Sequence, residues 1–370
     1  MAHRITFKPQ EMLLSSAIGD VDIDVDGTYV DVTLTAFGNV VLLSERYYAH
    51  AGKVTLYDLG TLIEDNMRIS NYATADFTLR VFSDTVNNKA DSWVIHVLYC
   101  DRFTANADVS FFLKENFLTT LSVRRITANS TVSLFFYAEK GESVAYTIAH
   151  TFRTIGGPAQ YKHQYTMDSG KTATSSGVVQ INIAQSAIVA DAAGFALVRP
   201  SNIELVTFCV RVGQRSITFF VDPSLDERET FYFRNCFNVW DRAALPIVTT
   251  AKTDVDRSLA VINGTSRFYN QTTEKTYEVE AKPLTSDEAE WIDQLFSSHD
   301  TFRIEPDATN PEDPLIVVPI LITECTCEMQ DGDEKPNSIK FKWRYANNRP
   351  IVHLPASPGI FTSPFNPIYS

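Results

Sequence analysis

The chain has 370 residues, of which 44% are hydrophobic and 21% charged, and its formal net charge is −13. This composition excludes a disordered chain, because enough apolar surface is present to offset the entropy lost on folding. The acidic balance argues against binding to a nucleic acid, whose phosphate backbone is held by clustered lysines and arginines. The length exceeds one ordinary core and predicts two or three domains.

The N-terminus and the cysteines bear on where the chain is made. No apolar run follows Met1, and no stretch approaches the roughly 18 apolar residues of a membrane-spanning helix. We therefore expect no signal peptide, no transmembrane helix and synthesis in a cytoplasm.

The five cysteines, an odd and sparse set, do not suggest a disulfide framework, so we expect reduced, partly buried thiols. They are Cys100, Cys209, Cys236, Cys325 and Cys327.

Residues 1–105 are predicted to form a β-sandwich. Short runs of alternating apolar and polar residues, bounded by Gly, Asp or Asn, indicate strands. These runs cover residues 28–37, 52–59, 75–84 and 91–101. The acidic run DVDIDVDG, residues 20–27, has the spacing of a calcium loop, but Thr33 stands where the closing glutamate is required. We interpret it as an edge strand whose charges discourage sheet-to-sheet pairing.

Residues 106–225 show the same alternation and are predicted to form a second β-sandwich. The strand-like runs cover residues 130–141, 142–152, 177–185, 203–213 and 215–223. The sequence SGKT, residues 169–172, lacks the upstream glycine and the following helix of a phosphate-binding loop. We interpret it as a hairpin loop.

The two segments resemble weak copies of one unit. We match residues 47–50 with 149–152, the glycine-led run 52–56 with 177–181, and the closing hairpin 77–99 with 205–221. Strands spaced at about 8 to 12 residues are typical of immunoglobulin-like sandwiches. The sequence therefore predicts two such sandwiches in tandem, an arrangement suited to a rod or spacer.

Residues 226–352 differ because they contain the one amphipathic helix that the sequence predicts. In residues 283–300, Thr285 can cap the helix and Glu288 can close a capping box. Ala289, Ile292 and Leu295 then recur at helical spacing. Strand-like runs lie on both sides of the helix, so we predict a β-rich α+β module in which the helix covers one face of a sheet.

The last strand of this module alternates aromatic and basic residues, which places the two kinds on opposite sides. The aromatic residues are Phe341, Trp343 and Tyr345, and the basic residues are Lys340, Lys342 and Arg344. The basic side is either a solvated face or a contact for an acidic neighbour. In a subunit interface such charges would set register more than affinity. The three basic residues are therefore candidate interface residues.

Residues 353–370 are predicted to form an extended arm. The sequence PASPGIFTSPFNPIYS contains four prolines, which prevent a helix. We expect a neighbouring subunit to cover its large apolar side chains. These candidate interface residues are Ile360, Phe361, Phe365, Ile368 and Tyr369.

Catalytic and cofactor motifs are not evident in the sequence. The seven histidines are scattered without metal-ligand spacing, and no GxSxG elbow occurs, so we expect no metal, no cofactor and no enzymatic activity. Two alternatives stay open. Tryptophans such as Trp93 and Trp240 could stack on a sugar instead of filling a core, and two carboxylates from distant loops could form a glycosidase site.

Three stretches of the third segment resemble a family of known proteins. They are FYFRNCFNVWDR, the helix in TYEVEAKPLTSDEAEWIDQLFSSHDTFRI, and the pair PILITECTCEMQ and KFKWRYANNRP. In this order they are similar to tail-associated structural proteins encoded by phages and prophages of Bacteroides-type gut bacteria. The close resemblance covers about a third of the chain. The two sandwich segments share only the general character of that family's sequences and none of its motifs.

The resemblance implies a structural protein of a phage tail, at the distal tail, baseplate or tail tip, that assembles into a homo-oligomeric ring. It implies location in the virion, with copies of itself and other tail proteins (tail tube, hub and fibres) as partners. That family supplies no catalytic residues to carry over. The alternative functions are a carbohydrate- or receptor-binding tail protein with a surface glycan as partner, and a glycan hydrolase.

Overall fold

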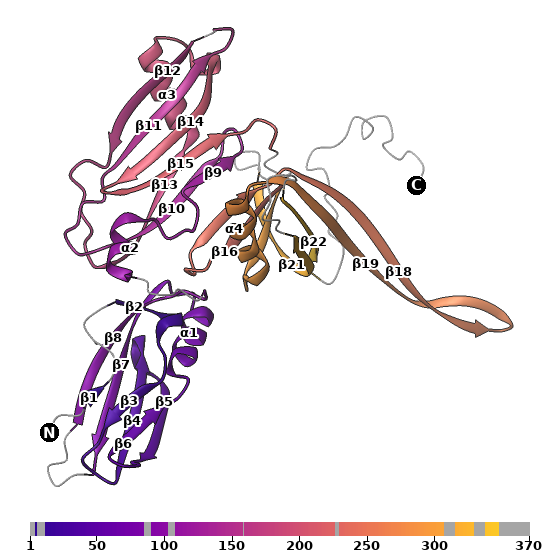
Figure 1. Cartoon of the computed structure of the whole chain (residues 1–370). Helices are drawn as coiled ribbons and strands as arrows, with labels where there is room; N and C mark the ends of the chain where they lie inside the picture. Colours follow the sequence, from indigo (N-terminus) through magenta and orange to yellow (C-terminus); the bar gives the residue numbers. More distant parts are fainter. Residues whose placement is uncertain are drawn as a thin grey trace, which may run out of the picture.

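The computed structural model describes residues 4–5, 12–84, 90–102, 108–157, 159–225, 229–306, 315–328 and 337–347. The fold is mainly β (Figure 1). Two tandem immunoglobulin-like sandwiches are followed by a β-rich α+β module with one amphipathic helix. The predicted C-terminal arm, residues 353–370, lies outside the described residues.

The first sandwich packs a five-stranded sheet against a three-stranded one. The larger sheet has the order β2 (Met12–Leu14), β8 (Ala90–Leu98), β7 (Thr74–Ser83), β4 (Tyr29–Ala36) and β5 (Val40–Tyr48). The smaller sheet has the order β1 (Arg4–Ile5), β3 (Val21–Asp24) and β6 (Lys53–Leu56). The prediction of an acidic edge strand at residues 20–27 is wrong, because β3 pairs with both β1 and β6 and is the central strand of this sheet. Its alternate residues Val21 and Ile23 are buried in the core.

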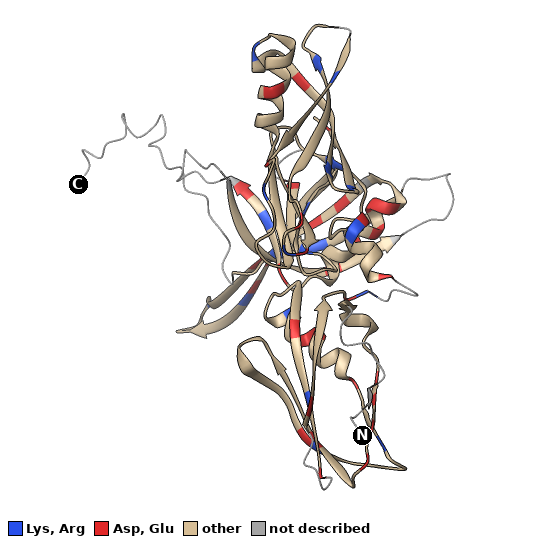
Figure 2. Cartoon of the chain, turned by 90° about the vertical axis from the view of Figure 1, so that its left-hand side faces the viewer, with Lys and Arg blue, Asp and Glu red and all other residues tan. Residues whose placement is uncertain are grey.

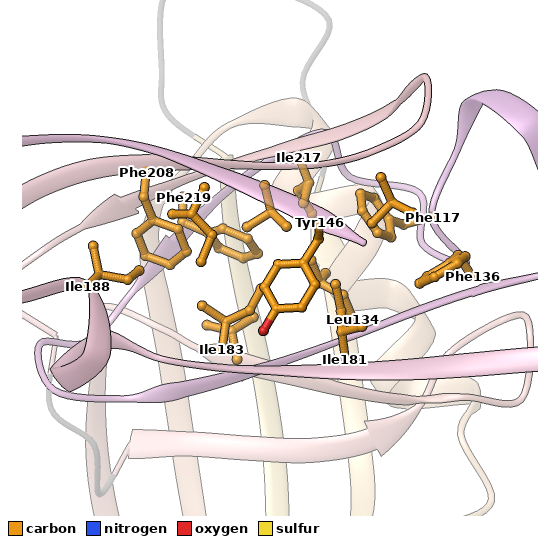
Figure 3. Close-up of a cluster of buried hydrophobic side chains, with 14 of the residues drawn as sticks. Phe117, Leu134, Phe136, Tyr146, Ile181, Ile183, Ile188, Phe208, Ile217 and Phe219 are labelled. Atoms are coloured by element: carbon orange, nitrogen blue, oxygen red, sulfur yellow. The ribbon is translucent and has the colours of Figure 1, made fainter. Parts of the chain in front are cut away.

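The second sandwich has a five-stranded and a two-stranded sheet. The larger sheet has the order β12 (Gln160–Met167), β11 (Tyr146–Thr154), β14 (Ile203–Val212), β15 (Arg215–Val221) and β9 (Val123–Ile126). The smaller sheet pairs β10 (Thr131–Ala138) with β13 (Gly177–Ala184). Figure 3 shows the core between them, with Phe136, Phe208 and Phe219 among its side chains. Residues 169–172 join β12 to β13, which belong to different sheets, so they are a crossover and not the predicted hairpin loop.

The two sandwiches share one topology. In each, a short strand (β2 or β9) runs parallel to the last strand of a closing hairpin (β7–β8 or β14–β15). The glycine-led strands β6 and β13 lie in equivalent places, as their sequences predict. The predicted match of residues 47–50 with 149–152 is wrong, because the former end the outer strand β5 and the latter lie in the inner strand β11.

Three helices besides the predicted one occur in the described residues. They are α1 (Leu59–Ile69), α2 (Val109–Glu115) and α3 (Gln185–Ala196). Helices α1 and α3 occupy the same place in the two sandwiches, directly after β6 and β13. The run 52–59 was predicted as one strand, but β6 ends at Leu56. Gly60 then lets α1 approach the preceding chain, where a Cβ would lie 2.0 Å from the Ile18 carbonyl oxygen.

The third unit is a seven-stranded sheet with a helix on one face. Its order is β17 (Trp240–Ala244), β16 (Thr230–Arg234), β20 (Thr301–Pro306), β21 (Leu315–Glu328), β22 (Asn337–Tyr345), β19 (Thr265–Leu284) and β18 (Ile247–Ile262). Helix α4 (Ser286–Ser297) has the predicted capping box. The Glu288 amide donates to Thr285 Oγ1 (3.2 Å), and the Thr285 amide donates to Glu288 Oε2 (3.0 Å). Ile292 and Leu295 are fully buried between the helix and the sheet.

Both sandwiches contact the module through specific polar groups. Arg125 of the second sandwich donates to Glu288 of α4, with Nε 2.7 Å from Oε1. In the β16–β17 loop, Asn238 Nδ2 donates to the Met67 carbonyl oxygen of the first sandwich (3.1 Å). Figure 2 shows acidic and basic residues interspersed along all three units. The module is therefore the body to which both sandwiches attach.

Candidate assembly surface

The longest strands of the chain, β18 and β19, form a hairpin that projects from the module (Figure 1). Asn263 and Gly264 connect the strands, with φ of 53° and 76°. Left-handed conformations at both central residues give the tight two-residue turn whose twist matches that of paired strands. The Asn263-Gly264 turn therefore joins the two strands at the outer end of the hairpin.

Only the base of this hairpin has support from the rest of the described chain. Strand β19 pairs with β22 from Tyr277 to Leu284, and outward of Tyr277 its backbone pairs with β18 alone. Residues 250–257 and 261–272 are all exposed. The unsupported part of β19 spans about 12 residues, or roughly 40 Å at the usual rise per residue.

One face of the hairpin continues the face that forms the core at its base. At the base, Val279 and Ala281 are fully buried on this face. Because side chains alternate along a strand, Val255, Leu259 and Val261 follow on the same face further out. Their exposed fractions are 42%, 64% and 72%, and Phe268, directly opposite Leu259, is 58% exposed. The same face also carries Thr253 and Arg257 on β18 and Lys275 and Gln271 on β19, so exposed apolar side chains alternate with polar and charged ones beyond the core.

The opposite face of the hairpin is acidic. It presents Asp254 and Asp256 on β18, with Glu274 opposite Asp254 and Glu278 nearer the base on β19. All four residues are exposed. The outer hairpin therefore has an acidic face and a mixed face, on which Leu259, Val261 and Phe268 are exposed beside polar side chains.

The structure places the predicted basic residues of β22 together on this charged side of the sheet, beside acids of the same chain. Lys340 Nζ lies 3.7 Å from Glu280 Oε1, and Arg344 Nε lies 3.5 Å from Glu274 Oε1. Lys342 Nζ donates to Glu324 Oε2 (2.7 Å), and this hydrogen bond raises the pKa of Lys342. The acidic neighbours come from the adjacent strands β19 and β21. On the opposite side Phe341 and Trp343 are buried, as predicted.

The other predicted interface residues belong to the C-terminal arm. Ile360, Phe361, Phe365, Ile368 and Tyr369 all lie outside the described residues. The hairpin has a sequence signal that was not recognised as a surface: two long strand-like runs flank Asn263-Gly264, the dipeptide typical of such turns. No sequence pattern shows that the other described residues leave its outer half uncovered.

Two of the clefts between the units, as far as the chain is described, are large enough to consider as binding sites. One, with a volume of about 350 Å³, separates the second sandwich from the module, and its lining includes Tyr232, Trp240 and Phe302. The other, of about 1170 Å³, separates the two sandwiches, and its lining includes Phe37 and Tyr72.

Among the described residues, no group of three or more His, Cys, Asp or Glu side chains is placed to hold a metal ion. No helix in the described ranges is long and apolar enough to cross a membrane.

Comparisons with known proteins give only distant likenesses. No family model matches the chain, and no curated protein matches it. Among solved structures, the calcium binding domain CBD12 of CALX1.1 is 13% identical, with 57% of this chain and 79% of that chain covered and a TM-score of 0.18. Trypsin-activated alpha-2-macroglobulin from Escherichia coli is 11% identical, with 92% and 28% covered and a TM-score of 0.19. A Salmonella alpha-2-macroglobulin mutant is 10% identical, with 96% and 27% covered and a TM-score of 0.20. The chain thus spans little more than a quarter of the macroglobulin chains, and TM-scores this low carry no argument about function.

Proposed function

We propose that this chain is a non-enzymatic structural protein of a bacteriophage tail, a distal-tail, baseplate or tail-tip component that assembles into a homo-oligomeric ring. The motifs of the module, which resemble tail-associated proteins, support the place in the virion. The geometry of the hairpin supports the assembly. The partners are further copies of this chain and neighbouring tail proteins.

The observation that carries the proposal is the set of exposed apolar side chains on the outer hairpin, which no described residue covers. Burying a side chain such as Leu259 or Phe268 contributes about 1.5–3 kcal/mol before the costs of association. The core beneath α4 cannot cover these residues, because they lie far out along an unsupported two-stranded ribbon. A second copy can cover them without any rearrangement of the first.

The sheet also suits a head-to-tail contact, in which neighbouring copies use different surfaces. Its two edge strands are β18, which belongs to the hairpin, and β17, which lies beside the second sandwich. These edges differ in length and surroundings, so a contact between the hairpin of one copy and another part of the next copy joins unlike surfaces. Such a contact generates a ring when the repeated rotation closes. Paired charges such as Lys340 with Glu280 would then keep the sheet in register.

Substitutions on the two faces of the hairpin test the proposal. The double variant Leu259→Ser and Phe268→Ser removes two of the exposed apolar side chains, and we expect it to be a folded monomer, because both side chains are exposed in the isolated chain. The control, Asp256→Asn, changes the acidic face of the same hairpin, three residues nearer its base than Leu259, and is expected to keep the assembly. Light scattering after size-exclusion chromatography and electron microscopy of the particles give the result. A wild-type chain that stays monomeric across the accessible concentration range contradicts ring formation.

A second candidate function is glycan binding in the 1170 Å³ cleft between the sandwiches. Phe37 and Tyr72, with exposed fractions of 77% and 42%, offer aromatic surface there, and Asp76 and Glu139 offer hydrogen-bond acceptors. Aromatic rings beside polar groups suit a sugar, which has both apolar and hydroxyl faces. Calorimetric titration with host surface polysaccharide checks this function, and Tyr72→Ala is then expected to weaken binding.

A further inference from the structure

The three units of the chain meet in one small apolar cluster that contains two cysteines. The first sandwich contributes Leu14, Leu98 and Cys100, the segment leading into the second contributes Leu113 and Leu118, and the module contributes Cys236, Phe237 and Val239. Cys100 is 1% exposed and Cys236 is 2% exposed. These two cysteines, separated by 136 residues in sequence (236 − 100), therefore share one buried site.

Hydrogen bonds fix the backbone at both cysteines. The Cys100 amide donates to Ser15 Oγ (2.9 Å), and Ser15 Oγ donates back to the Cys100 carbonyl oxygen (3.0 Å). The Cys236 amide donates to Gln294 Oε1 of α4 (3.0 Å). The Asp101 amide donates to the Cys236 carbonyl oxygen (3.2 Å), which joins the two segments directly. The two cysteine side chains therefore belong to one buried cluster, and the backbone next to Cys100 is hydrogen-bonded directly to Cys236.

We propose that Cys100 and Cys236 are a site of disulfide formation by hydrogen peroxide or a related small peroxide, which covalently joins the first sandwich to the module. Cys209, Cys325 and Cys327 lie on other strands, in β14 and β21. The proposed cross-link acts within one chain, whatever that chain assembles with.

The environment of the pair distinguishes the two sulfur atoms. Contact with Cys236 lowers the pKa of the Cys100 thiol, whereas contact with Cys100 and burial raise the pKa of the Cys236 thiol. A thiolate is the reactive form of cysteine. We therefore assign the first attack to Cys100 and the resolving attack to Cys236, an order that labelling of the sulfenic acid tests.

The two steps balance with peroxide as the oxidant. The Cys100 thiolate attacks one peroxide oxygen, the O–O bond breaks, and Cys100 becomes a sulfenic acid while hydroxide leaves and takes up the Cys100 proton to form water. Cys236 Sγ then attacks Cys100 Sγ, the S–O bond breaks, and the departing hydroxide takes the Cys236 proton as a second water. Two thiols are oxidised and one peroxide is reduced to two waters.

Mass mapping of the intact wild-type chain tests the proposal directly. The folded, reduced protein is treated with hydrogen peroxide, and the remaining thiols are then alkylated in denaturant. Of the five cysteines, we expect alkylation at Cys209, Cys325 and Cys327 and a cross-linked peptide that contains Cys100 and Cys236. Because a cross-link over a long loop restricts the unfolded chain, the melting temperature of the oxidised protein rises, and dithiothreitol reverses the rise.

Three variants sharpen the result. Cys100→Ser and Cys236→Ser each abolish the cross-link and the rise in melting temperature, and the matched control Cys209→Ser keeps both. In Cys236→Ser, dimedone is expected to label a sulfenic acid on Cys100. Native peroxide treatment that leaves Cys100 and Cys236 alkylatable, or that links either of them to another cysteine, overturns the proposal. The wild-type map decides this even where a serine variant fails to fold.

Discussion

Arg124 of the second sandwich and Asp241 of the module form a buried, bidentate ion pair across the boundary between the two units. Their side chains are 5% and 3% exposed. Asp241 also accepts hydrogen bonds from Trp291 Nε1 of α4 (3.0 Å) and from Asn235 Nδ2 (3.3 Å). One carboxylate thus connects β9, the β16–β17 loop and the helix of the module.

Removing this carboxylate is expected to be strongly destabilising. In Asp241→Ala the Arg124 guanidinium stays buried without its counter-charge, so the free energy of unfolding falls by about 3–5 kcal/mol. Urea unfolding followed by tryptophan fluorescence measures the loss. The control Asp31→Ala removes an exposed pair with Arg46 in the first sandwich and is expected to leave the midpoint almost unchanged. Equal effects of both variants would contradict the role of burial.

The capping box of α4 gives a smaller and more local prediction. Thr285→Ala removes the acceptor for the Glu288 amide, and we expect a loss of about 1 kcal/mol in the stability of the module. Thr285→Ser keeps a hydroxyl acceptor and is expected to retain most of it. Chemical unfolding of the two variants side by side provides the measurement. A Ser variant as unstable as the Ala variant would show that the hydroxyl is not the stabilising group.

His150 of the second sandwich is expected to make stability depend on pH. Its burial lowers its pKa, against the opposing effect of Asp191, whose Oδ2 lies 2.8 Å from His150 Nε2. His163 and Tyr165 are its other ionisable neighbours. Since the unfolded chain binds the proton more readily, this contribution is present above the ordinary histidine pKa of about 6.5 and is lost as pH falls below it.

The variant His150→Gln isolates that contribution. We expect the difference in unfolding free energy between wild type and variant to shrink as pH falls from about 8 to 5. The exposed His50 provides the control, because His50→Gln is expected to follow the wild-type profile. A wild-type and a His150→Gln curve that run parallel throughout would rule out this histidine as the source.

The C-terminal arm gives a prediction about assembly. Deletion of residues 355–370 removes the five apolar side chains that we expect a neighbouring copy to cover. The truncated chain should fold, since the three cores lie within residues before 347, but it should not form rings. Electron microscopy of the full-length and truncated proteins compares them, and intact rings from the truncated chain would refute the arm as a clasp.

Local signals explain which elements were predicted correctly. Alternation over runs such as residues 203–213 marks strands, because one face of a sandwich strand is buried and the other is solvated. Helix α4 was found because Thr285 and Glu288 carry a capping signal that acts within four residues. Helix α3 lacks such a signal, since Ala184 stands at its N-cap. Helices α1 and α2 were missed although Asp58 and Asp108 precede them, and Asp108 accepts a capping hydrogen bond from the Phe111 amide.

The sequence by itself determined the mainly β fold, the α4 helix and the opposite placement of Phe341 and Lys342 on one strand, because each depends on neighbours within a few residues. Only the tertiary structure decided that no other described segment covers the outer hairpin, that acids of adjacent strands flank the basic residues of β22, and that Cys100 and Cys236 share one cluster. Those relationships join residues tens to hundreds of positions apart. These relationships form when strands pair and units pack, and a local pattern of residues does not specify which distant residue becomes the partner.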